Sequence, residues 1–337
     1  MSPYEEKYRK AAMKDEPDAG SSHETTVRGA SFDLSAWIRR LKQAGPRIAR
    51  RLGREEAGGV RVENIVWIFG AGRTGSTWLS QMMGEIEGHS VWFEPWVGAL
   101  FDPYHLRLEH RKGRHFILTP RYRSTWLKSI RSFVLDGAGV RFPEVSKKNE
   151  YLVIKEPGGS VGAPLLIEAV PESRMILLVR DPRDVAASWM DARRKGGWRH
   201  KDRNQEDGES ETLADRDPLA YMRKRAKTYL QVMGNAKQAY EAHEGYKVLV
   251  RYEDLRADTL GTMKRIYSTL EIPVEEAQLV QAVNKHAWEN IPEDEKGQGK
   301  FYRKATPGGW KEDLTQEQVK TVEKITAPLL DELYPPS

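Results

Sequence analysis

Four short apolar stretches recur along the chain, and each is bounded by polar or glycine-rich sequence. They lie at residues 62–69, 151–154, 175–179 and 248–251. Each is too short for an independent helix and has the continuous apolar character of a strand that is buried on both faces. Segments with apolar residues at helical spacing alternate with them, at residues 76–87, 163–170, 184–194 and 255–270. This alternation predicts a three-layer α/β fold, in which a central parallel sheet is flanked by helices on both faces.

The N-terminal part of the chain lacks this alternation. Residues 1–32 are polar and show no apolar periodicity, which predicts a disordered tail. Residues 33–60 mix apolar side chains with arginines and lysines around Pro46, a pattern typical of a basic amphipathic helical segment. Such a segment either docks on the folded domain or, through residues 34–54, contacts a membrane surface or a partner. We therefore expect the folded domain to occupy residues 61–337.

The composition limits the classes of ligand and compartment. The chain of 337 residues has no cysteine, which rules out disulfides and thiolate ligands and fits a reducing, cytoplasmic setting. It has no run of about 20 apolar residues, which a membrane-spanning helix would need. The net charge is +5, from 54 basic and 49 acidic residues, which favours a small anionic ligand over a nucleic acid. The eight histidines show no spacing of metal ligands, so we expect no metal.

A glycine-rich loop follows the first predicted strand and precedes the first predicted helix. Residues 70–77 read GAGRTGST, which has the glycine spacing of a phosphate-binding P-loop. Such a loop directs backbone N–H groups and the positive end of a helix at an anion. Ser76 stands where nucleoside triphosphatases have the lysine that grips phosphate, so Arg73 is the only cation inside the loop. This departure argues against the usual metal-linked grip on ATP, although a P-loop kinase using ATP and magnesium stays an alternative.

Three further segments place basic or aromatic residues at strand ends or in turns. Residues 179–188 (VRDPRDVAAS) set Arg180 at a strand end, directly before a helix with proline in its first turn. Residues 251–255 (RYEDL) again join a strand end to a helix start, and residues 303–311 (RKATPGGWK) join two cations to a Pro-Gly-Gly turn. Arginine suits phosphate because its planar guanidinium donates two parallel hydrogen bonds.

In this combination the chain resembles the sulfotransferases that depend on 3′-phosphoadenosine-5′-phosphosulfate (PAPS). Residues 73–78 (RTGSTW) resemble the family's 5′-phosphosulfate loop, and residues 179–188 resemble its 3′-phosphate motif. The resemblance implies a P-loop-like α/β fold, a catalytic domain at residues 61–337, PAPS as co-substrate and 3′,5′-ADP as product. Within residues 303–311 the sequence departs from the family's motif at Ala305, which replaces a glycine, and at Gly309, which replaces an aspartate. The donor-binding residues that it implies are Arg73, Thr74, Gly75, Ser76, Thr77, Trp78, Arg180, Ser188, Tyr252, Arg303 and Lys304.

The resemblance also implies which part of the donor several of these residues would contact. Arg180 and Ser188 would bind the 3′-phosphate that distinguishes PAPS from ordinary nucleotides. Trp78 would stack on the adenine, and Tyr252 would contact the nucleotide. The two cations of residues 303–311 would form a mobile basic flap.

The catalytic residues are less sharply marked. Many cytosolic members of the family place a histidine after a lysine-threonine pair, but residues 155–157 read Lys-Glu-Pro here, so we expect a carboxylate as general base. Glu94, in a Glu-Pro pair like that of carbohydrate sulfotransferases, is the first choice, and Glu156 is the rival. Lys155 would steady the transferring sulfonate or the leaving oxygen. Arg73 would stabilise the charge that develops on the leaving phosphate.

No motif marks the acceptor. Residues 92–141 and 198–218 are expected to carry its specificity, the second of them as a flexible surface loop. Trp92, Trp96 and Trp126 are candidates for an acceptor pocket, and aromatic side chains suit small-molecule, carbohydrate and lipid acceptors alike. The non-enzymatic alternative is a nucleotide-binding or membrane-surface adaptor built around the basic N-terminal segment.

Overall fold

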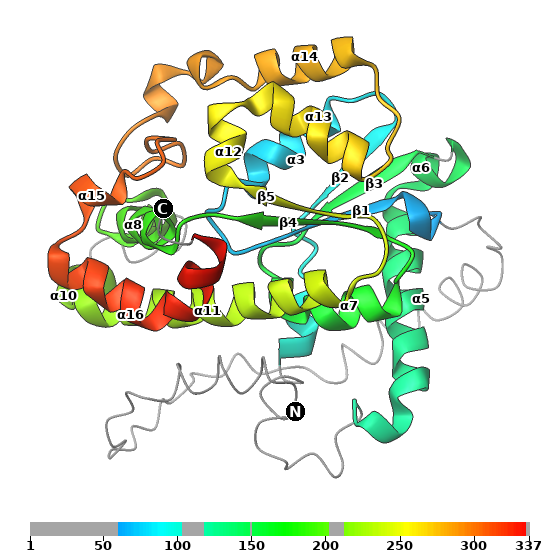
Figure 1. Cartoon of the computed structure of the whole chain (residues 1–337), viewed down its shortest axis with the longest axis horizontal. Coiled ribbons are helices and arrows are strands. Elements are labelled where there is room, and N and C mark those ends of the chain that lie inside the picture. Colours follow the sequence, from blue (N-terminus) through cyan, green and yellow to red (C-terminus); the bar gives the residue numbers. More distant parts are fainter. Residues whose placement is uncertain (1–59, 103–117, 149, 202–211, 335–337) are drawn as a thin grey trace, which may run out of the picture.

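The computed structural model describes residues 60–102, 118–148, 150–201 and 212–334 (Figure 1). The predictions for residues 1–32, and for all of 33–60 except its last residue, lie outside these ranges. Within the described ranges, no helix is long and apolar enough to cross a membrane.

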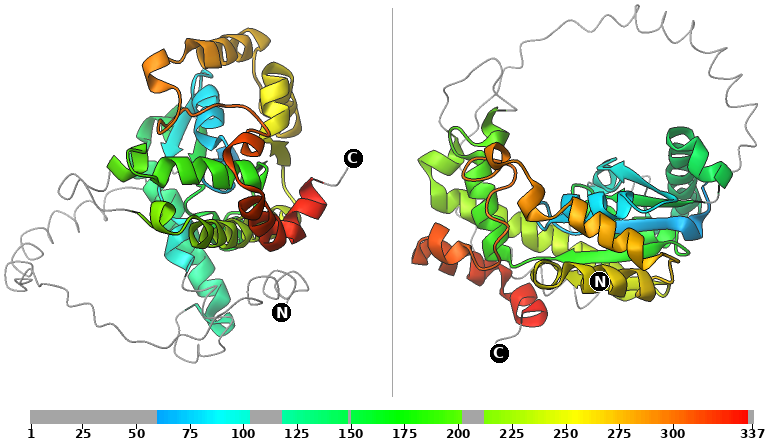
Figure 2. Two further views of the ribbon diagram at one scale, coloured as in Figure 1. Left: turned by 90° about the vertical axis from the view of Figure 1, so that its left-hand side faces the viewer. Right: turned by 90° about the horizontal axis from the view of Figure 1, so that it is seen from above.

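A five-stranded sheet forms the centre of the fold (Figure 1 and Figure 2). Its strands are β1 (Ile65–Phe69), β2 (His89–Phe93), β3 (Tyr151–Lys155), β4 (Arg174–Val179) and β5 (Lys247–Arg251). All pairings are parallel, in the order β2-β3-β1-β4-β5. In this register, Trp67 of β1 lies against Ile154 of β3 on one side and Met175 of β4 on the other. The strand order reverses beside β1, and α/β folds place ligands at the carboxyl end of such a switch point.

The side chains of the strands alternate between two separate cores. On β1, Ile65, Trp67 and Phe69 belong to one core, whereas Val66 and Ile68 belong to the other. All five side chains are fully buried, as expected for a strand in a parallel sheet that is covered on both faces. Burial on both faces makes the apolar run continuous, which is why the sequence pattern identifies this strand.

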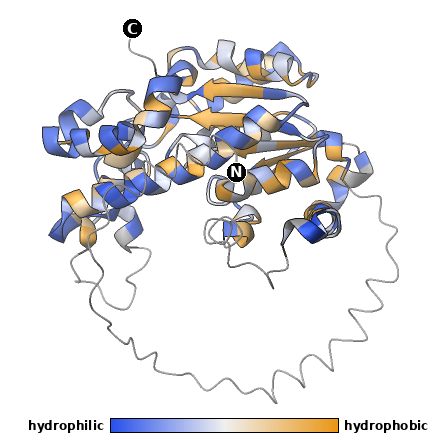
Figure 3. Cartoon of the chain, turned by 60° about the horizontal axis from the view of Figure 1, so that its bottom comes forward, coloured by the Kyte–Doolittle hydropathy of each residue, from blue (hydrophilic) through white to orange (hydrophobic). Residues whose placement is uncertain are grey.

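Helices cover both faces of the sheet (Figure 1). One layer comprises α3 (Ser76–Gly84), α12 (Tyr252–Ala257), α13 (Thr259–Thr269) and α14 (Glu276–Lys285). The opposite layer comprises α5 (Arg123–Arg141), α7 (Ala163–Ala169), α8 (Pro182–Arg193), α11 (Pro218–Ala242) and α16 (Gln316–Leu333). Figure 3 shows apolar strands between helices whose outer faces are hydrophilic. The predicted three-layer α/β architecture is confirmed.

The helix predicted at residues 255–270 is wrong in one respect, because two helices, α12 and α13, occupy this stretch. The chain leaves the helical conformation at Asp258, which has φ −140° and ψ 85°. The Asp258 side chain accepts a hydrogen bond from the N–H of Gly261 and caps α13. The apolar stripe predicts where the helices face the core, but it does not reveal this local cap.

The predicted loop at residues 198–218 is only partly a loop. Helices α9 (Trp198–Lys201) and α10 (Leu213–Arg216) occupy its two ends, while residues 202–211 lie outside the described ranges. Trp198 packs edge-on against Phe301, with 5.2 Å between the ring centroids. The start of the segment is therefore anchored by an aromatic contact that its polar composition hides.

Candidate active site

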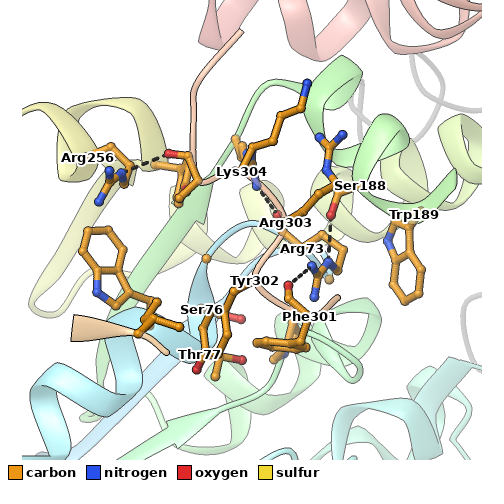
Figure 4. Close-up of a pocket in the computed structure, with 18 of the residues that line it drawn as sticks. Arg73, Ser76, Thr77, Ser188, Trp189, Arg256, Phe301, Tyr302, Arg303 and Lys304 are labelled. Atoms are coloured by element: carbon orange, nitrogen blue, oxygen red, sulfur yellow. Dashed lines mark hydrogen bonds between the residues drawn. The ribbon is translucent and has the colours of Figure 1, made fainter. Parts of the chain in front are cut away.

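The carboxyl ends of the five strands meet at one edge of the sheet and surround a single pocket. Glu94 follows β2, the loop with Arg73 follows β1, Lys155 ends β3, Arg180 follows β4 and Tyr252 follows β5. All five residues line the pocket, part of which is drawn in Figure 4. The parallel arrangement of the strands brings together residues that lie far apart in the sequence.

The β1–α3 loop needs glycine at two positions. A Cβ on Gly70 would lie 2.4 Å from the carbonyl oxygen of Leu178, so the loop is pressed against β4. Gly75 has φ +91°, and a Cβ there would lie 2.5 Å from the ring of Tyr252. Ser76 and Thr77 then start α3 and line the pocket. The backbone N–H groups at the start of α3 lack intrahelical partners, which makes this end of the helix suitable for an anion.

Thr74 has a different place from its neighbours in the loop. Its side chain is fully buried, and its hydroxyl donates a hydrogen bond of 2.8 Å to the carbonyl oxygen of Ala71. It does not line the pocket. Thr74 thus shapes the loop, whereas Ser76 and Thr77 present their hydroxyls to the pocket.

Arg73 bridges the loop to two other elements (Figure 4). Its Nε donates to Ser188 Oγ of α8 at 2.9 Å, and its guanidinium donates to the carbonyl oxygen of Phe301 at 2.8 Å. The guanidinium also lies over the rings of Trp198 and Phe301, 5.4 and 4.7 Å from their centroids. Burial, together with the nearby Arg180, lowers the pKa of Arg73 to about 10. The side chain is therefore still cationic at neutral pH.

Arg180 and Ser188 form a second polar region, joined to the loop through Arg73. Arg180 is 8% exposed, donates to the carbonyl oxygen of Arg73 at 3.1 Å and lies 4.1 Å from the ring centroid of Tyr252. Its Nε is buried and has no hydrogen-bond partner among the described residues. A buried guanidinium with an unpaired N–H fits an anionic oxygen, as the 3′-phosphate of PAPS would provide.

Trp78 and Tyr252 supply the aromatic wall of the pocket. Their rings meet edge-on with centroids 6.4 Å apart. The indole N–H of Trp78 donates to the carbonyl oxygen of His286 at 2.8 Å, and the Arg256 guanidinium lies over the same indole. The indole is thus fixed in orientation, as a stacking surface for a nucleotide base requires.

Arg303 and Lys304 also line the pocket, from the segment before α15 (Trp310–Asp313). Both form ion pairs with Asp313, and Lys304 also pairs with Glu312 at 2.9 Å. These carboxylates hold the two cations beside the pocket.

The structure separates the two candidate bases. Glu94 lines the pocket and forms an ion pair with Lys155, whose side chain is 2% exposed and lies 3.7 Å from the ring centroid of Phe93. Burial lowers the pKa of Lys155, although Glu94 opposes this shift. Glu156 is fully buried and accepts hydrogen bonds of 3.0 Å from the N–H groups of Trp96 and Gly98. It does not line the pocket.

The three tryptophans considered for the acceptor lie outside this pocket. Trp126 is in the core, and Trp92 packs against Phe142 at 5.9 Å between ring centroids. Trp96 is 52% exposed, close to Gly158 beside the pocket residue Pro157.

Two groups of residues near the site were not identified from the sequence. Glu253 accepts from the N–H of Asp181 at 3.0 Å, and the Tyr229 hydroxyl donates to the carbonyl oxygen of Arg180 at 2.6 Å. Together they fix the backbone that carries Arg180. The Tyr-Glu-Asp-Leu segment contains Glu253, so the sequence could have pointed to this residue. Tyr229 lies in the long helix α11, where no motif marks it.

The second group lines the pocket beside Arg73. Trp189, Trp198 and Arg199 come from α8 and α9, and Arg199 stacks on Trp198 at 4.9 Å from its ring centroid. Trp189 could have been singled out from the sequence, because it directly follows Ser188 at the end of the segment 179–188. The other two belong to the segment interpreted as a loop.

Cations dominate the pocket lining, which includes a single carboxylate, Glu94. The cationic residues are Arg73, Lys155, Arg180, Arg199, Arg256, Arg303 and Lys304. Such an excess of positive charge concentrates a polyanionic ligand in the pocket. In the described part of the chain, no group of three or more acidic or histidine side chains is placed to hold a metal ion.

Comparisons with known proteins give a matching family and solved structures of similar fold. A protein-family model described as "Sulfotransferase domain" matches residues 63–333. The solved structure of sulfotransferase STF9 from Mycobacterium avium is similar, with a TM-score of 0.51 and 17% identity over 90% of this chain and 87% of that one. Mouse sulfotransferase SULT7A1, solved in complex with PAP, has a TM-score of 0.49 and 15% identity over 80% of this chain and 85% of that one.

No curated protein matches the chain. The family match, however, spans the sheet and every strand end that surrounds the pocket. It decides against the P-loop kinase and against the non-catalytic adaptor. The chain therefore belongs to the family of PAPS-dependent sulfotransferases, which transfer a sulfuryl group from PAPS to an acceptor.

Proposed function

We propose that this sulfotransferase acts on a hydroxyl or amine of a small-molecule, carbohydrate or lipid acceptor and uses Glu94 as general base. The observation that carries the proposal is the ion pair between Glu94 and Lys155 on the pocket wall. The rival Glu156 has both carboxylate oxygens engaged by backbone N–H groups and does not line the pocket. Of the described carboxylates, Glu94 alone lines the cationic pocket.

The donor site would extend from the β1–α3 loop to Arg180. PAPS, when bound, supplies the sulfuryl group, and its bond from sulfur to the bridging phosphate oxygen breaks. Ser76, Thr77 and the first N–H groups of α3 would hold the 5′-phosphate and the charge that develops on it. Arg180 and Ser188 would hold the 3′-phosphate, and Trp78 would stack on the adenine. This arrangement is supported by the unpaired Nε of Arg180 and by the fixed Trp78 indole.

Glu94 would take up the acceptor proton at a carboxylate oxygen as the acceptor atom forms its bond to sulfur. Lys155 holds this carboxylate in place through the ion pair and adds positive charge at the end of β3. Phe93 and Trp96, on either side of the Glu94-Pro95 pair, are 53% and 52% exposed. Their rings would support an acceptor with an apolar face.

Replacing Glu94 by glutamine tests the assignment. We expect Glu94→Gln to lower kcat by about 100-fold or more, because glutamine cannot accept the proton. The affinity for 3′,5′-ADP should change little, because Glu94 is proposed to contact the acceptor and not the nucleotide. The measurement uses labelled PAPS with small molecules extracted from cells, and mass spectrometry of the sulfated products.

Glu156→Gln serves as the comparison, assayed well below its melting temperature. Near-wild-type turnover by Glu94→Gln, together with loss of turnover in Glu156→Gln, would show that Glu156 is the base instead.

A further inference from the structure

One face of α8 carries three polar side chains toward the segment before α15. Asp184, Ser188 and Asp191 follow one another at spacings of four and three residues, which places them on the same side of a helix. Ser188 Oγ accepts the hydrogen bond from Arg73. The two aspartates face the backbone of residues 299–310, here named the strap.

The aspartates hold the strap at both ends. Asp184 is fully buried, and its carboxylate accepts from the N–H groups of Gly308 and Trp310 at 2.7 and 3.0 Å. Asp191 accepts from the N–H of Gly299 at 2.8 Å. Hydrogen bonds from backbone N–H groups to an ionised carboxylate are among the stronger ones in proteins.

Between these two ends, the strap passes along the pocket. Phe301, Arg303, Lys304 and Ala305 line the pocket, and Figure 4 shows the first three beside Arg73 and Ser188. The carbonyl oxygens of Phe301 and Ala305 accept hydrogen bonds from Arg73 and Arg256. The strap is thus held by carboxylates at its ends and by cations of the pocket in its middle.

Asp184 does not itself line the pocket. Burial raises its pKa, and the nearby Arg180 and the two strap N–H groups oppose this shift. The Arg183 guanidinium lies 4.1 Å from the ring centroid of Trp310 and fixes the same end of the strap from the outside. Asp184 can therefore affect the donor in two ways, through the strap that it holds and through its charge beside Arg180.

We propose that Asp184 and Asp191 are positioning residues for the donor, because they set the strap so that Arg303 and Lys304 face the 3′-phosphate. The proposal rests on the placement of the 3′-phosphate beside Arg180 and Ser188 described above. Without the aspartates, the strap shifts and its two cations no longer meet this phosphate.

The test compares the affinities of Asp184→Asn for 3′,5′-ADP and for 5′-AMP, which lacks the 3′-phosphate, by calorimetry. Asparagine has one acceptor oxygen and turns an amide N–H toward the second strap N–H. We expect binding of 3′,5′-ADP to weaken about tenfold and that of 5′-AMP to change by less than about twofold. Asp191→Asn, which loses one hydrogen bond, should show a smaller loss of the same kind.

Asp215→Asn is the matched control. Asp215 also accepts backbone hydrogen bonds, from Lys195 and Thr212, but it does not line the pocket or contact the strap. Its replacement should leave the ratio of the two affinities at the wild-type value.

Hydrogen exchange of ligand-free protein gives a readout that does not depend on the donor. The amides of Gly308 and Trp310 should exchange faster in Asp184→Asn than in wild type. An unchanged exchange rate, or an unchanged ratio of affinities with a lowered melting temperature, would overturn the proposal. Equal affinity of the wild type for 3′,5′-ADP and 5′-AMP would instead show that the proposed donor placement is wrong.

Discussion

Glu94 and Glu156 follow the paired strands β2 and β3, and their carboxylates meet different partners. Glu94 pairs with the Lys155 ammonium at the pocket, whereas Glu156 receives backbone hydrogen bonds from Trp96 and Gly98. Burial raises the pKa of Glu156 to about 7, although the two N–H groups oppose the shift. Glu156 therefore fixes the turn after β2, and through this turn it fixes the position of Glu94.

Glu156→Gln should destabilise the protein. The amide group of glutamine replaces one carboxylate oxygen and faces a backbone N–H, so that two buried donors oppose each other. We expect the free energy of unfolding to fall by about 1–3 kcal/mol, measured by urea denaturation at pH 7.5. Unchanged stability would show that the turn is held by other contacts.

The same variant should alter the pH dependence of stability. The folded-state pKa of Glu156, about 7, lies above its ordinary value of 4.5, so the folded protein keeps this proton over a range where the unfolded chain has lost it. The contribution of Glu156 to stability therefore falls as pH rises from about 4.5 to 7. Unfolding free energies measured across this range should fall less steeply in Glu156→Gln than in wild type.

At the scale of elements, the β1–α3 loop depends on a backbone conformation that few residues can adopt. Arg73 and Gly75 both have positive φ, of 74° and 91°. Arg73 is kept in this conformation by its hydrogen bonds to Ser188 and Phe301. Gly75 instead leaves room for the Tyr252 ring, so a side chain there would disturb both the turn and the aromatic wall.

Gly75→Ala should weaken the binding of 3′,5′-ADP about tenfold in calorimetry, because the added Cβ displaces Tyr252 and strains the turn. Gly88→Ala is the control. Gly88 has a similar φ of +74°, but a Cβ there would make only an ordinary contact of 3.7 Å with Glu150. An equal loss of affinity in both variants would mean that general destabilisation, and not the contact with Tyr252, causes the effect.

The elements also show what the sequence could and could not predict. Strands β1, β3 and β4 were predicted because burial on both faces makes their apolar runs continuous. Strand β5, at one edge of the sheet, is fully buried on one face only but still has the apolar run Val248, Leu249 and Val250. The edge strand β2 has half-exposed residues and no such run. Helix α9 was missed because its polar sequence gives no sign that Trp198 packs on Phe301 across about 100 residues of chain.

The candidate site likewise contains residues that the sequence predicted and contacts that it could not predict. Motifs at strand ends predicted Arg73, Arg180 and Tyr252, because these positions are local to a strand and the loop after it. Glu94 was predicted from its Glu-Pro pair alone, since strand β2 before it was not. The hydrogen bonds of Asp184 to Gly308 and Trp310 could not be predicted, since they join a helix to a distant backbone segment.

The charge of the pocket matters at the scale of the whole molecule. The chain carries a net charge of only +5, yet the pocket combines seven cationic side chains with the single carboxylate of Glu94. Acidic residues elsewhere in the chain balance most of the basic ones. The pocket is therefore a local positive region in a protein of modest net charge.

This charge distribution should make 3′,5′-ADP a stabilising ligand. A ligand that binds only the folded state at about 100 times its Kd raises the free energy of unfolding by about 2.7 kcal/mol. We expect a larger increase in melting temperature with 3′,5′-ADP than with an equal concentration of ATP and magnesium, measured by differential scanning fluorimetry. A larger increase with ATP and magnesium would contradict the two-phosphate site built on Arg180.

The parallel order of the strands has a consequence for how the protein acquires its activity. Ile65 of β1 pairs with Leu152, and Val66 pairs with Arg174, so neighbouring strands are joined by long stretches of intervening chain. Contacts of such high sequence separation form slowly, because the intervening chain must be closed into a loop before they stabilise anything. Since each strand end supplies a pocket residue, we expect nucleotide binding to arise only after β5 has docked. During refolding, recovery of 3′,5′-ADP binding would thus report the completion of the sheet rather than its nucleation.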